Sequence, residues 1–570
     1  MSYEGKIGNI LTQKNFIEIR TLHHSMYRQK SRKCTHQSAL ILLCIFVYCS
    51  LAGLANAESM EKIIPTNLSS NPSNNSDPYV GISSKTYIPP PGIMPIVIMQ
   101  GDPYEMGYQY ALQAKDYIAI VRDAAWASAL TKNSSHEILQ SCREYRQYIA
   151  RELPQFDFLS FFRGMSDAMN DQGFQFGPDD PVVMLYWGGS KGPQPPDHCT
   201  AIAAFGNTTG KGMIAGTNFD YYHLPSNSYS IILALYPDSG NSCIIPSGAG
   251  RTGSNSAFND KGLIYILAAA SQKGPGDNGP GITGFLELPY VAMTCGNVPE
   301  AENFLINSTR MFGLNHLLLD AGGNATVLEA TRARYALRKA GDNNESDYLV
   351  VTNHYLNPRM KPSQPIWDPL KYYPSSYYRY ITAEKMIADQ RSRFNYTTAV
   401  RTFSLTDWWD GRKWHLDDPW STNTINRFRP DVATLYSAIA IPSDHKVSIC
   451  TGNPGMPYWG TLACGQTGTY VNLTLGKRPE DLVFDLKMDA TAVMWKTVQV
   501  MGKQPTEKAA NLWAEAENNY GEAIWWLDQA MLENKSSERA TAWGRSATSF
   551  AEVIAQAEMI QELCGPHPTN

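Results

Sequence analysis

The cysteine at position 199 follows a proline-rich run and precedes a short apolar stretch. The run Gly188–Asp197 reads GGSKGPQPPD, and TAIAAF follows Cys199. Such a thiol is half of a disulfide, a metal ligand or a nucleophile. A nucleophile needs a base, an oxyanion donor and groups that hold the geometry. A cysteine at a chain N-terminus supplies the base itself, because its α-amino group has a pKa of about 7.7–8. That chemistry requires cleavage between His198 and Cys199.

Short polar motifs follow Cys199 in a fixed order along the chain. Taken alone, Asn218 and Asp220 also suit a turn at the end of a strand, Asn353 suits a loop cap, and Arg379 suits a helix-surface pair. No zinc-protease HExxH, Walker loop or CxxC pair is present. We expect neither a metal nor an organic cofactor. The motifs are GTNFD (216–220), SAFNDKGLIYI (256–266), HLLLDAGGNATVLEAT (316–331), VVTNHY (350–355) and SSYYRY (375–380), with GDPYEMGYQYA (101–111) upstream.

In this order and spacing the motifs resemble a known class. They are similar to the N-terminal nucleophile (Ntn) cysteine hydrolases of the acyl-coenzyme A:6-aminopenicillanic acid acyltransferase (peptidase C45) and choloylglycine hydrolase type. The resemblance covers roughly residues 90–475. It departs at Thr217, where the choloylglycine branch has arginine, and at His198, where the acyltransferase branch often has glycine. The first departure places the chain nearer the acyltransferase branch.

The resemblance implies a role for each motif residue. Cys199 is the nucleophile, and its freed amine is the base. Asp220 orients that amine, and the Asn353 side chain donates to the oxyanion. Arg379 positions Asp220 or the new chain terminus, and Asn218 shapes the site. Cleavage at His198–Cys199 implies an α/β heterodimer made from one chain.

The far N-terminus predicts export. Basic residues precede the apolar run Ala39–Leu54, and Ala55–Ala57 offers a cleavage site for signal peptidase. An uncleaved signal anchor is the alternative, and we expect no other membrane contact. Ten N-x-S/T sequons fit a glycosylated, secreted or extracytoplasmic chain. The net charge of −5 gives no electrostatic reason to expect nucleic acid.

Export also changes how the cysteines are interpreted. Seven cysteines follow the signal segment, and in an oxidising compartment pairing is the default. An odd number leaves at least one thiol free within the chain. Cys450 and Cys464 flank a turn-rich loop and are the best candidates for a disulfide.

The pattern of elements predicts an α+β protein. Short strands bounded by turns begin at Cys199, with helices between them, and the chain becomes helical after Gly476. The resemblance makes this a four-layer αββα sandwich with a helical pro-segment and a helical C-terminal extension. The predicted parts are a signal segment or anchor (1–57), a disordered linker (58–88), the pro-segment (89–198), the Ntn core (199–476) and the C-terminal helices (477–570).

The predicted function is acyl transfer from a small-molecule amide or thioester through an acyl-enzyme on Cys199. Water is the expected acceptor outside a cell. Two alternatives stay open. One is a phospholipase B-like acyl hydrolase on the same fold. The other is an inactive surface glycoprotein with Cys199 in a disulfide.

Overall fold

The structure is a computed structural model. It describes residues 93–131, 133–187, 199–210, 212–222, 229–390, 392–427, 429, 432–450, 452–454, 468–501 and 505–564. All of these lie in one unit, Ile82–Asn570. The predicted signal segment, the linker 58–88, His198 and Cys464 lie outside the described residues.

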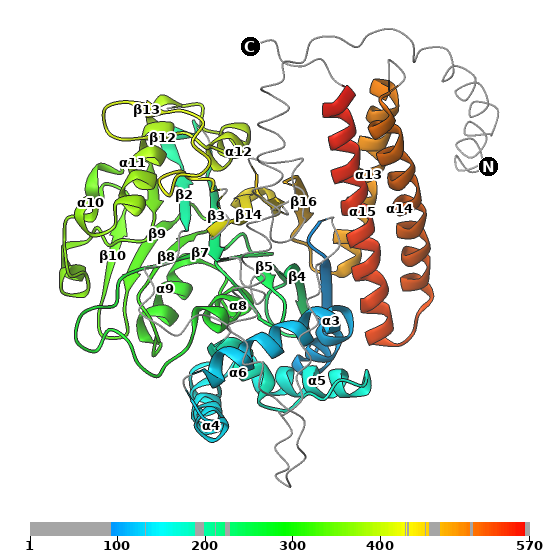
Figure 1. The fold of residues 1–570 in the computed structure, drawn as a ribbon, viewed down its shortest axis with the longest axis horizontal. Coiled ribbons are helices and arrows are strands. Elements are labelled where there is room, and N and C mark those ends of the chain that lie inside the picture. The colour runs from blue at the N-terminus through cyan, green and yellow to red at the C-terminus, as the bar shows by residue number, and fades with distance from the viewer. Residues whose placement is uncertain are drawn as a thin grey trace, which may run out of the picture. The chain divides into compact units, whose positions relative to one another are not determined.

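Two large β-sheets form the centre of this unit (Figure 1). The first has eight strands in the order β1-β4-β5-β6-β7-β8-β9-β10, and the second has six in the order β11-β2-β3-β14-β15-β16. The strands of the first are β1 (Ile96–Gly101), β4 (Ser230–Pro237), β5 (Cys243–Gly248), β6 (Ser256–Asn259), β7 (Ile264–Ala269), β8 (Leu314–Leu319), β9 (Ala325–Ala330) and β10 (Tyr335–Lys339). The strands of the second are β2 (Thr200–Ala204), β3 (Ile214–Tyr222), β11 (Tyr348–Val351), β14 (Val432–Ile441), β15 (Lys446–Cys450) and β16 (Tyr470–Thr474).

Apolar residues on both faces of the strands produce the layers. In β2, Ala201 and Ala203 belong to the core between the sheets, whereas Ile202 and Ala204 belong to the core under the helices. Successive side chains of a strand point to opposite faces, so a strand buried on both faces reads as a continuous apolar run. This explains why TAIAAF lacks the alternation of a half-exposed strand.

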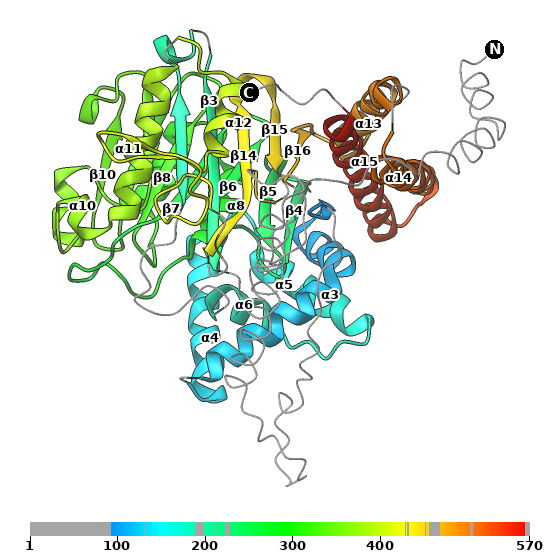
Figure 2. The ribbon, with the colours of Figure 1, turned by 45° about the horizontal axis from the view of Figure 1, so that its top comes forward.

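Helices cover the outer face of each sheet (Figure 2). Helices α11 and α12 pack on the six-stranded sheet through Tyr380, Ala383 and Phe403. Helices α8 and α9 pack on the eight-stranded sheet. The predicted α+β class is confirmed, and the layers run helix, sheet, sheet, helix. The helices of these layers are α8 (Gly284–Thr294), α9 (Val298–Asn307), α10 (Pro369–Tyr372), α11 (Pro374–Asp389) and α12 (Tyr396–Phe403).

A short aromatic hairpin supports α11 from outside. It consists of β12 (Trp408–Trp409) and β13 (Trp414–His415). The ring of Trp408 stacks on His415 at 4.0 Å between centroids and lies 4.9 Å from the ring of Tyr378 on α11. These contacts help fix the helix that carries Arg379.

Helices also precede and follow the two sheets. Helix α3 begins with a capping box between Asp102 and Glu105. Helix α15 packs on both β1 and α3. Thr548 of α15 donates to Ile96 of β1 and accepts from its amide, so the C-terminal helices share a core with the sheets. These helices are α3 (Pro103–Leu130), α4 (Ser135–Glu152), α5 (Phe158–Asp171), α6 (Asp180–Trp187), α13 (Pro479–Met501), α14 (Glu507–Leu532) and α15 (Ser536–Cys564).

Candidate active site

Cys199 lies at the entry to β2, between two neighbouring strands. Its side chain belongs to the core between the sheets and is 2% exposed. Strand β3 pairs with β2 so that Thr200 faces Asn218, which places Asp220 two residues beyond that pair. On the other side Val351 of β11 faces Ala201. Continuing that antiparallel register by two residues brings Asn353 opposite Cys199.

Arg379 joins the nucleophile candidate to the oxyanion candidate. Its Nη1 donates to the carbonyl oxygen of Cys199 at 2.5 Å and to Thr200 Oγ1 at 2.8 Å. Its Nη2 donates to Asn353 Oδ1 at 2.6 Å. The guanidinium is fully buried, and this fork of donors replaces the hydration that burial removes. Arg379 therefore fixes the backbone of residue 199 and the side chain of Asn353 together.

Asn353 is held from several sides. Its amide nitrogen donates to Ser376 Oγ at 2.7 Å, and its side-chain Nδ2 donates to the carbonyl oxygen of Ala269 at 2.8 Å. A side-chain amide has two N–H donors. The Asn353 oxygen accepts from Arg379, and one of its two N–H groups donates to Ala269. The second N–H group is therefore left to donate to an oxyanion.

Asp220 lies in a buried ionic cluster on the helix-facing side of the sheet. Thr434 Oγ1 donates to its Oδ1 at 2.6 Å, and Arg427 Nε lies 3.4 Å from its Oδ2. Asp220 and Arg427 are both fully buried. Burial raises the pKa of Asp220 to about 6, although Arg427 and Arg379 act to lower it. Burial lowers the pKa of Arg427, and the neighbouring charge of Arg379 lowers it further.

A β-bulge in β14 sends two side chains to opposite faces of the sheet. Thr434 pairs with Asp220, and the register then shifts so that Tyr436 pairs with Phe219. Without the extra residue, side chains two apart would share a face. With it, Thr434 reaches Asp220, while Tyr436 packs in the core that contains Cys199. The Tyr436 hydroxyl donates to Asn255 Oδ1 at 2.5 Å and pairs with Ser254.

Asn218 ties the sheet to the helical layer. Its Nδ2 donates to the carbonyl oxygens of Phe403 at 2.8 Å and Ile425 at 3.0 Å. Both amide protons are thus used on backbone acceptors. These two bonds tie β3 to the end of α12 and to the segment that follows it, and the predicted shaping of the site by Asn218 stays a prediction.

The first turn of α11 collects the polar groups of the site. Ser376 accepts from Asn353, and its hydroxyl lies 2.7 Å from His354 Nδ1. Ser375 accepts from Arg427 Nη2 at 2.5 Å and donates to the carbonyl oxygen of Thr422. With Arg379, this first part of α11 therefore contacts both Asn353 and Arg427. Pro374 suits the first helical position, because that N–H has no intrahelical partner.

The cluster around Asp220 has more positive than negative charge. Two buried guanidinium groups, Arg379 and Arg427, face one buried carboxylate, Asp220. Charges taken out of water are costly unless they are compensated. Arg379 is the member of this cluster that contacts residue 199, through the Cys199 carbonyl oxygen, and a positive charge there favours the negative oxygen of a tetrahedral intermediate. The arrangement is therefore suited to acyl transfer at Cys199.

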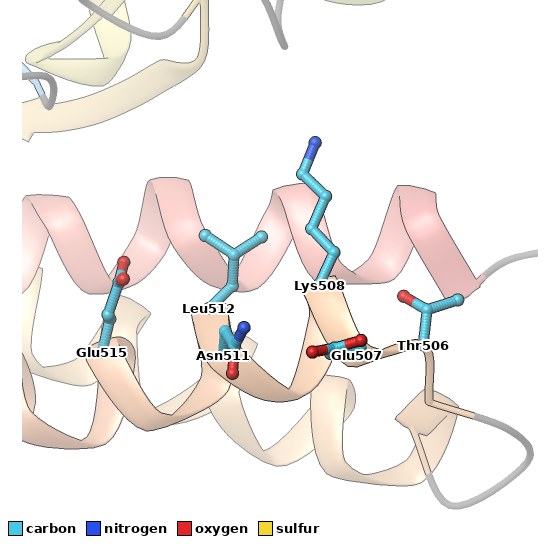
Figure 3. A pocket seen from close by; sticks show the side chains of 6 residues that line it. All are labelled: Thr506, Glu507, Lys508, Asn511, Leu512 and Glu515. Atoms are coloured by element: carbon cyan, nitrogen blue, oxygen red, sulfur yellow. The ribbon is translucent and has the colours of Figure 1, made fainter.

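Other features of the described chain add no second centre. No disulfide joins any two of the six described cysteines, Cys199 included. In the same residues no group of histidine, cysteine or acidic side chains is arranged to hold a metal ion, and no helix is long and apolar enough to cross a membrane. A hollow of about 570 Å³ lies at the start of α14, lined by Thr506, Glu507, Lys508, Asn511, Leu512 and Glu515 (Figure 3). None of the predicted site residues lines it.

Comparisons with known proteins bear on the class of this site. Residues 207–456 match the family model described as acyl-coenzyme A:6-aminopenicillanic acid acyl-transferase. The match includes Asp220, Asn353 and Arg379, and it begins eight residues after Cys199. An uncharacterized protein from Archaeoglobus fulgidus is 20% identical over 306 residues, which cover 46% of this chain. This chain spans about half the length of that curated relative (50%).

Two solved structures are similar to part of the chain. Both are altered forms of the conjugated bile acid hydrolase from Clostridium perfringens, one described as a mutant and one as a variant. They share 10% and 12% identity, cover 49% of this chain and 93% of each structure, and have TM-scores of 0.29 and 0.31. TM-scores this low carry no argument about the fold, which rests on the chain's own helices and sheets.

The family model covers less than half of the chain, and the layers around it are those of an α+β protein. The resemblance to the acyl-coenzyme A:6-aminopenicillanic acid acyltransferase family is confirmed by the match over residues 207–456.

The structure brings all five predicted residues to the start of β2 and adds two that the sequence motifs missed. Arg427 and Tyr436 stand in no motif and are more than 200 residues from Cys199 in the sequence. The sequence does give a reason to single out Arg427, because an arginine just before an apolar strand is expected to be buried and to need a charged partner. The sequence does not say which carboxylate that partner is.

Proposed function

We propose that this chain is an exported, autoproteolytically activated N-terminal cysteine hydrolase or acyltransferase that acts on an amide or a thioester through Cys199. The observation that carries the proposal is the fork of Arg379. It binds the carbonyl oxygen of Cys199 and the side chain of Asn353, so it fixes the nucleophile's backbone beside an amide donor. The family match supports the class of reaction.

The first step is cleavage of the chain before Cys199. The Cys199 sulfur attacks the carbonyl carbon of His198, the C–N bond breaks, and the acyl group moves from nitrogen to sulfur. Water then hydrolyses this thioester. The products are a carboxylate on His198 and a free α-amino group and thiol on Cys199. Each fragment keeps its place in one heterodimer.

The second step uses the new α-amino group as the base. It accepts the thiol proton while the sulfur attacks the acyl carbon of the substrate. The second N–H of Asn353 donates to the developing oxyanion. The protonated amine then gives its proton to the leaving amine or thiol. Water attacks the resulting thioester, releases the acid and restores the thiol. No step in this sequence uses a metal or a cofactor.

The positions of the charged groups suit the base as well as the oxyanion. Asp220 orients the α-amino group, and the two arginines limit how strongly that amine holds a proton, because like charges disfavour the protonated form. The Cys199 side chain is 2% exposed in the described chain.

A comparison of acyl donors tests the function. Purified protein is incubated separately with an N-acyl amide, an acyl thioester and a diacyl phospholipid, each with the same acyl chain. Mass spectrometry of the quenched digest follows the peptide that contains Cys199. The proposal predicts an acyl adduct on Cys199 and turnover of the amide or thioester. Cys243→Ala is the matched control, because Cys243 is also buried but lies on β5 of the other sheet.

Each of the other outcomes identifies an alternative. Turnover of the phospholipid alone identifies a phospholipase B-like acyl hydrolase. An intact chain that turns over none of the three donors, with no adduct on Cys199, identifies an inactive glycoprotein. Loss of activity in Cys243→Ala equal to that in Cys199→Ala contradicts the assignment of the nucleophile.

A further inference from the structure

Helix α13 has a second apolar face, opposite the face that packs on the protein. The inner face contacts the core through Leu482, Leu486 and Ala490, all of which are fully buried. A helix that buries one face is usually polar on the other. On α13 the other face instead leaves four large apolar side chains in solvent: Phe484 is 42% exposed, Met488 66%, Trp495 71% and Val498 50%.

These exposed residues have the spacing of a coiled-coil seam. Together with Thr491, which is also exposed, they follow one another at intervals of four, three, four and three residues. Such intervals keep a narrow apolar stripe in line along a helix, and a stripe of this kind packs against a similar stripe on another helix. We call these five residues the outer stripe: Phe484, Met488, Thr491, Trp495 and Val498.

Contacts within the chain hold α13 with the outer stripe facing solvent. Thr497 Oγ1 donates to the carbonyl oxygen of Ala557 on α15 at 3.3 Å, and Thr491 Oγ1 lies 2.8 Å from the Tyr520 hydroxyl of α14. Because the inner face is already packed, rotation of α13 cannot bury the outer stripe without exposing the inner one. Burial of the stripe therefore requires a surface from outside this helical bundle.

The charges beside the outer stripe indicate which surface that is. Asp489 and Lys496 are seven residues apart, so they lie on the same flank of the stripe. In a parallel pair of two α13 helices, each of these charges meets its own copy. In an antiparallel pair centred on the stripe, Lys496 comes level with residue 490 of the second copy, one position from the second copy's Asp489. The flank is thus complementary to itself only in the antiparallel arrangement.

The same alignment also matches large side chains with small ones. It places Trp495 of one copy opposite Thr491 of the other, and Met488 opposite Val498, and two-fold symmetry repeats both pairs. A parallel pair would instead set one Trp495 ring against the other. A lipid surface is less suited to this face, because acidic residues outnumber basic ones over residues 479–564 and anionic headgroups repel them.

We propose that the outer stripe of α13 binds the outer stripe of a second copy of this chain, with the two helices antiparallel about a two-fold axis. The inference does not depend on the chemistry at Cys199. The stripe spans only about two heptads, or roughly 21 Å of helix. We therefore expect a reversible dimer with a dissociation constant on the order of micromolar.

Sedimentation velocity over a concentration series tests the interface. The purified wild type is compared with Trp495→Glu and with the matched control Trp525→Glu, since Trp525 is 53% exposed but lies on α14. Loss of a central interface tryptophan weakens association by about thirtyfold or more, and the new charge adds to this. Trp495→Glu should remain monomeric, whereas Trp525→Glu should associate as the wild type does. Circular dichroism checks that each variant is folded, and Met488→Glu replaces Trp495→Glu if that variant is not.

Two further sets of variants test the antiparallel direction. Met488→Cys and Val498→Cys are oxidised with diamide, separately and as a mixture, and the linked peptides are identified by mass spectrometry. The proposal predicts a disulfide between position 488 of one copy and position 498 of the other, in the mixture alone. Asp489→Lys and Lys496→Asp should each weaken the dimer severalfold at low salt, and the double variant should restore it.

The contradicting outcomes are equally specific. A wild type that stays monomeric at every concentration overturns the proposal. If that monomer floats with phosphatidylcholine vesicles and Trp495→Glu does not, a lipid surface is the occupant instead. If it dimerises only after residues 1–57 are removed, the apolar run Ala39–Leu54 is the occupant in the full chain. A dimer that Trp495→Glu leaves unchanged, or a disulfide between two copies of position 488, also contradicts the proposed pairing.

Discussion

Replacing Asn353 tests the oxyanion donor directly. Asn353→Ala removes the Nδ2 donor and the oxygen that accepts from Arg379 Nη2 at 2.6 Å. Loss of one preorganised donor to an oxyanion lowers kcat by about 10²–10³, or roughly 2.7–4 kcal/mol. Release of Arg379 from one of its three bonds adds to this loss, so we expect a fall in kcat of about 10³, with a smaller change in KM.

Asn353→Asp sharpens the same test because it preserves shape. The carboxylate still accepts from Arg379, but it cannot donate to an oxyanion, and it brings an oxygen against the carbonyl oxygen of Ala269, which Nδ2 now contacts at 2.8 Å. It also adds a negative charge beside the thiolate and the oxyanion. We therefore expect Asn353→Asp to be no more active than Asn353→Ala, and to cleave itself more slowly than the wild type.

Asn315→Ala is the matched control for these variants. The Asn315 side chain donates to the carbonyl oxygens of Thr352 and His354, the two neighbours of Asn353, at 3.0 Å each. Its loss leaves buried carbonyl groups unpaired and lowers the free energy of unfolding by about 1–3 kcal/mol. Steady-state kinetics of the three variants should show a large loss of kcat only at position 353. Equal losses at positions 315 and 353 would refute the oxyanion role, since support of the segment alone would then explain both.

Three further predictions concern stability and can be checked by chemical denaturation at several pH values. Asp220 has a folded pKa of about 6 against 3.8 in the unfolded chain, so its stabilising contribution is complete below about pH 4 and is lost as the pH rises through 6, a fall of about 3 kcal/mol that should be absent in Asp220→Asn. Burial lowers the pKa of His354 to about 3, so the contribution of the neutral histidine to the free energy of unfolding is present above pH 6.5 and is lost as the pH falls. Acid unfolding of His354→Asn should therefore take up about one proton fewer than that of the wild type. Gly216→Ala would bring a Cβ to 2.3 Å from the Phe403 ring and 3.0 Å from the carbonyl oxygen of Ala438 and should cost about 1–3 kcal/mol, whereas Gly521→Ala in α14, where a Cβ meets nothing within 4 Å, should stabilise the protein by up to about 1 kcal/mol. A flat profile in the wild type, an unchanged proton uptake or equal effects at the two glycines would each contradict the corresponding argument.

Much of the core could be predicted from local pattern. The hairpin from Cys199 to Asp220 follows from two apolar runs split by a turn, and β2 and β3 pair as that pattern requires. The VVTNHY segment supplies β11 and then Asn353, and SSYYRY begins α11. In each motif the candidate residue lies at the end of a strand or in the first turns of a helix. The same short pattern therefore predicts both the element and the position of the residue.

The rest depended on contacts between distant parts of the chain. Arg427 meets Asp220 across 207 positions, and the bulge at Thr434 that makes the contact possible leaves no turn residue in VATLYSAIAI to mark it. Likewise, the sequence predicted helices after Gly476 but not the packing of α15 on β1. Local propensity does not identify partners, because pairing is decided by tertiary packing.

Self-cleavage before Cys199 can be read from the N-terminal sequences of the protein's fragments. Purified wild-type protein is separated on a denaturing gel, and each band is sequenced from its N-terminus, beside Cys199→Ala and Cys243→Ala prepared in the same way. We expect a fragment that begins with Cys199 in the wild type and in Cys243→Ala, and one uncut chain in Cys199→Ala. A wild-type chain that remains intact, with a Cys199 thiol that resists labelling, would contradict it.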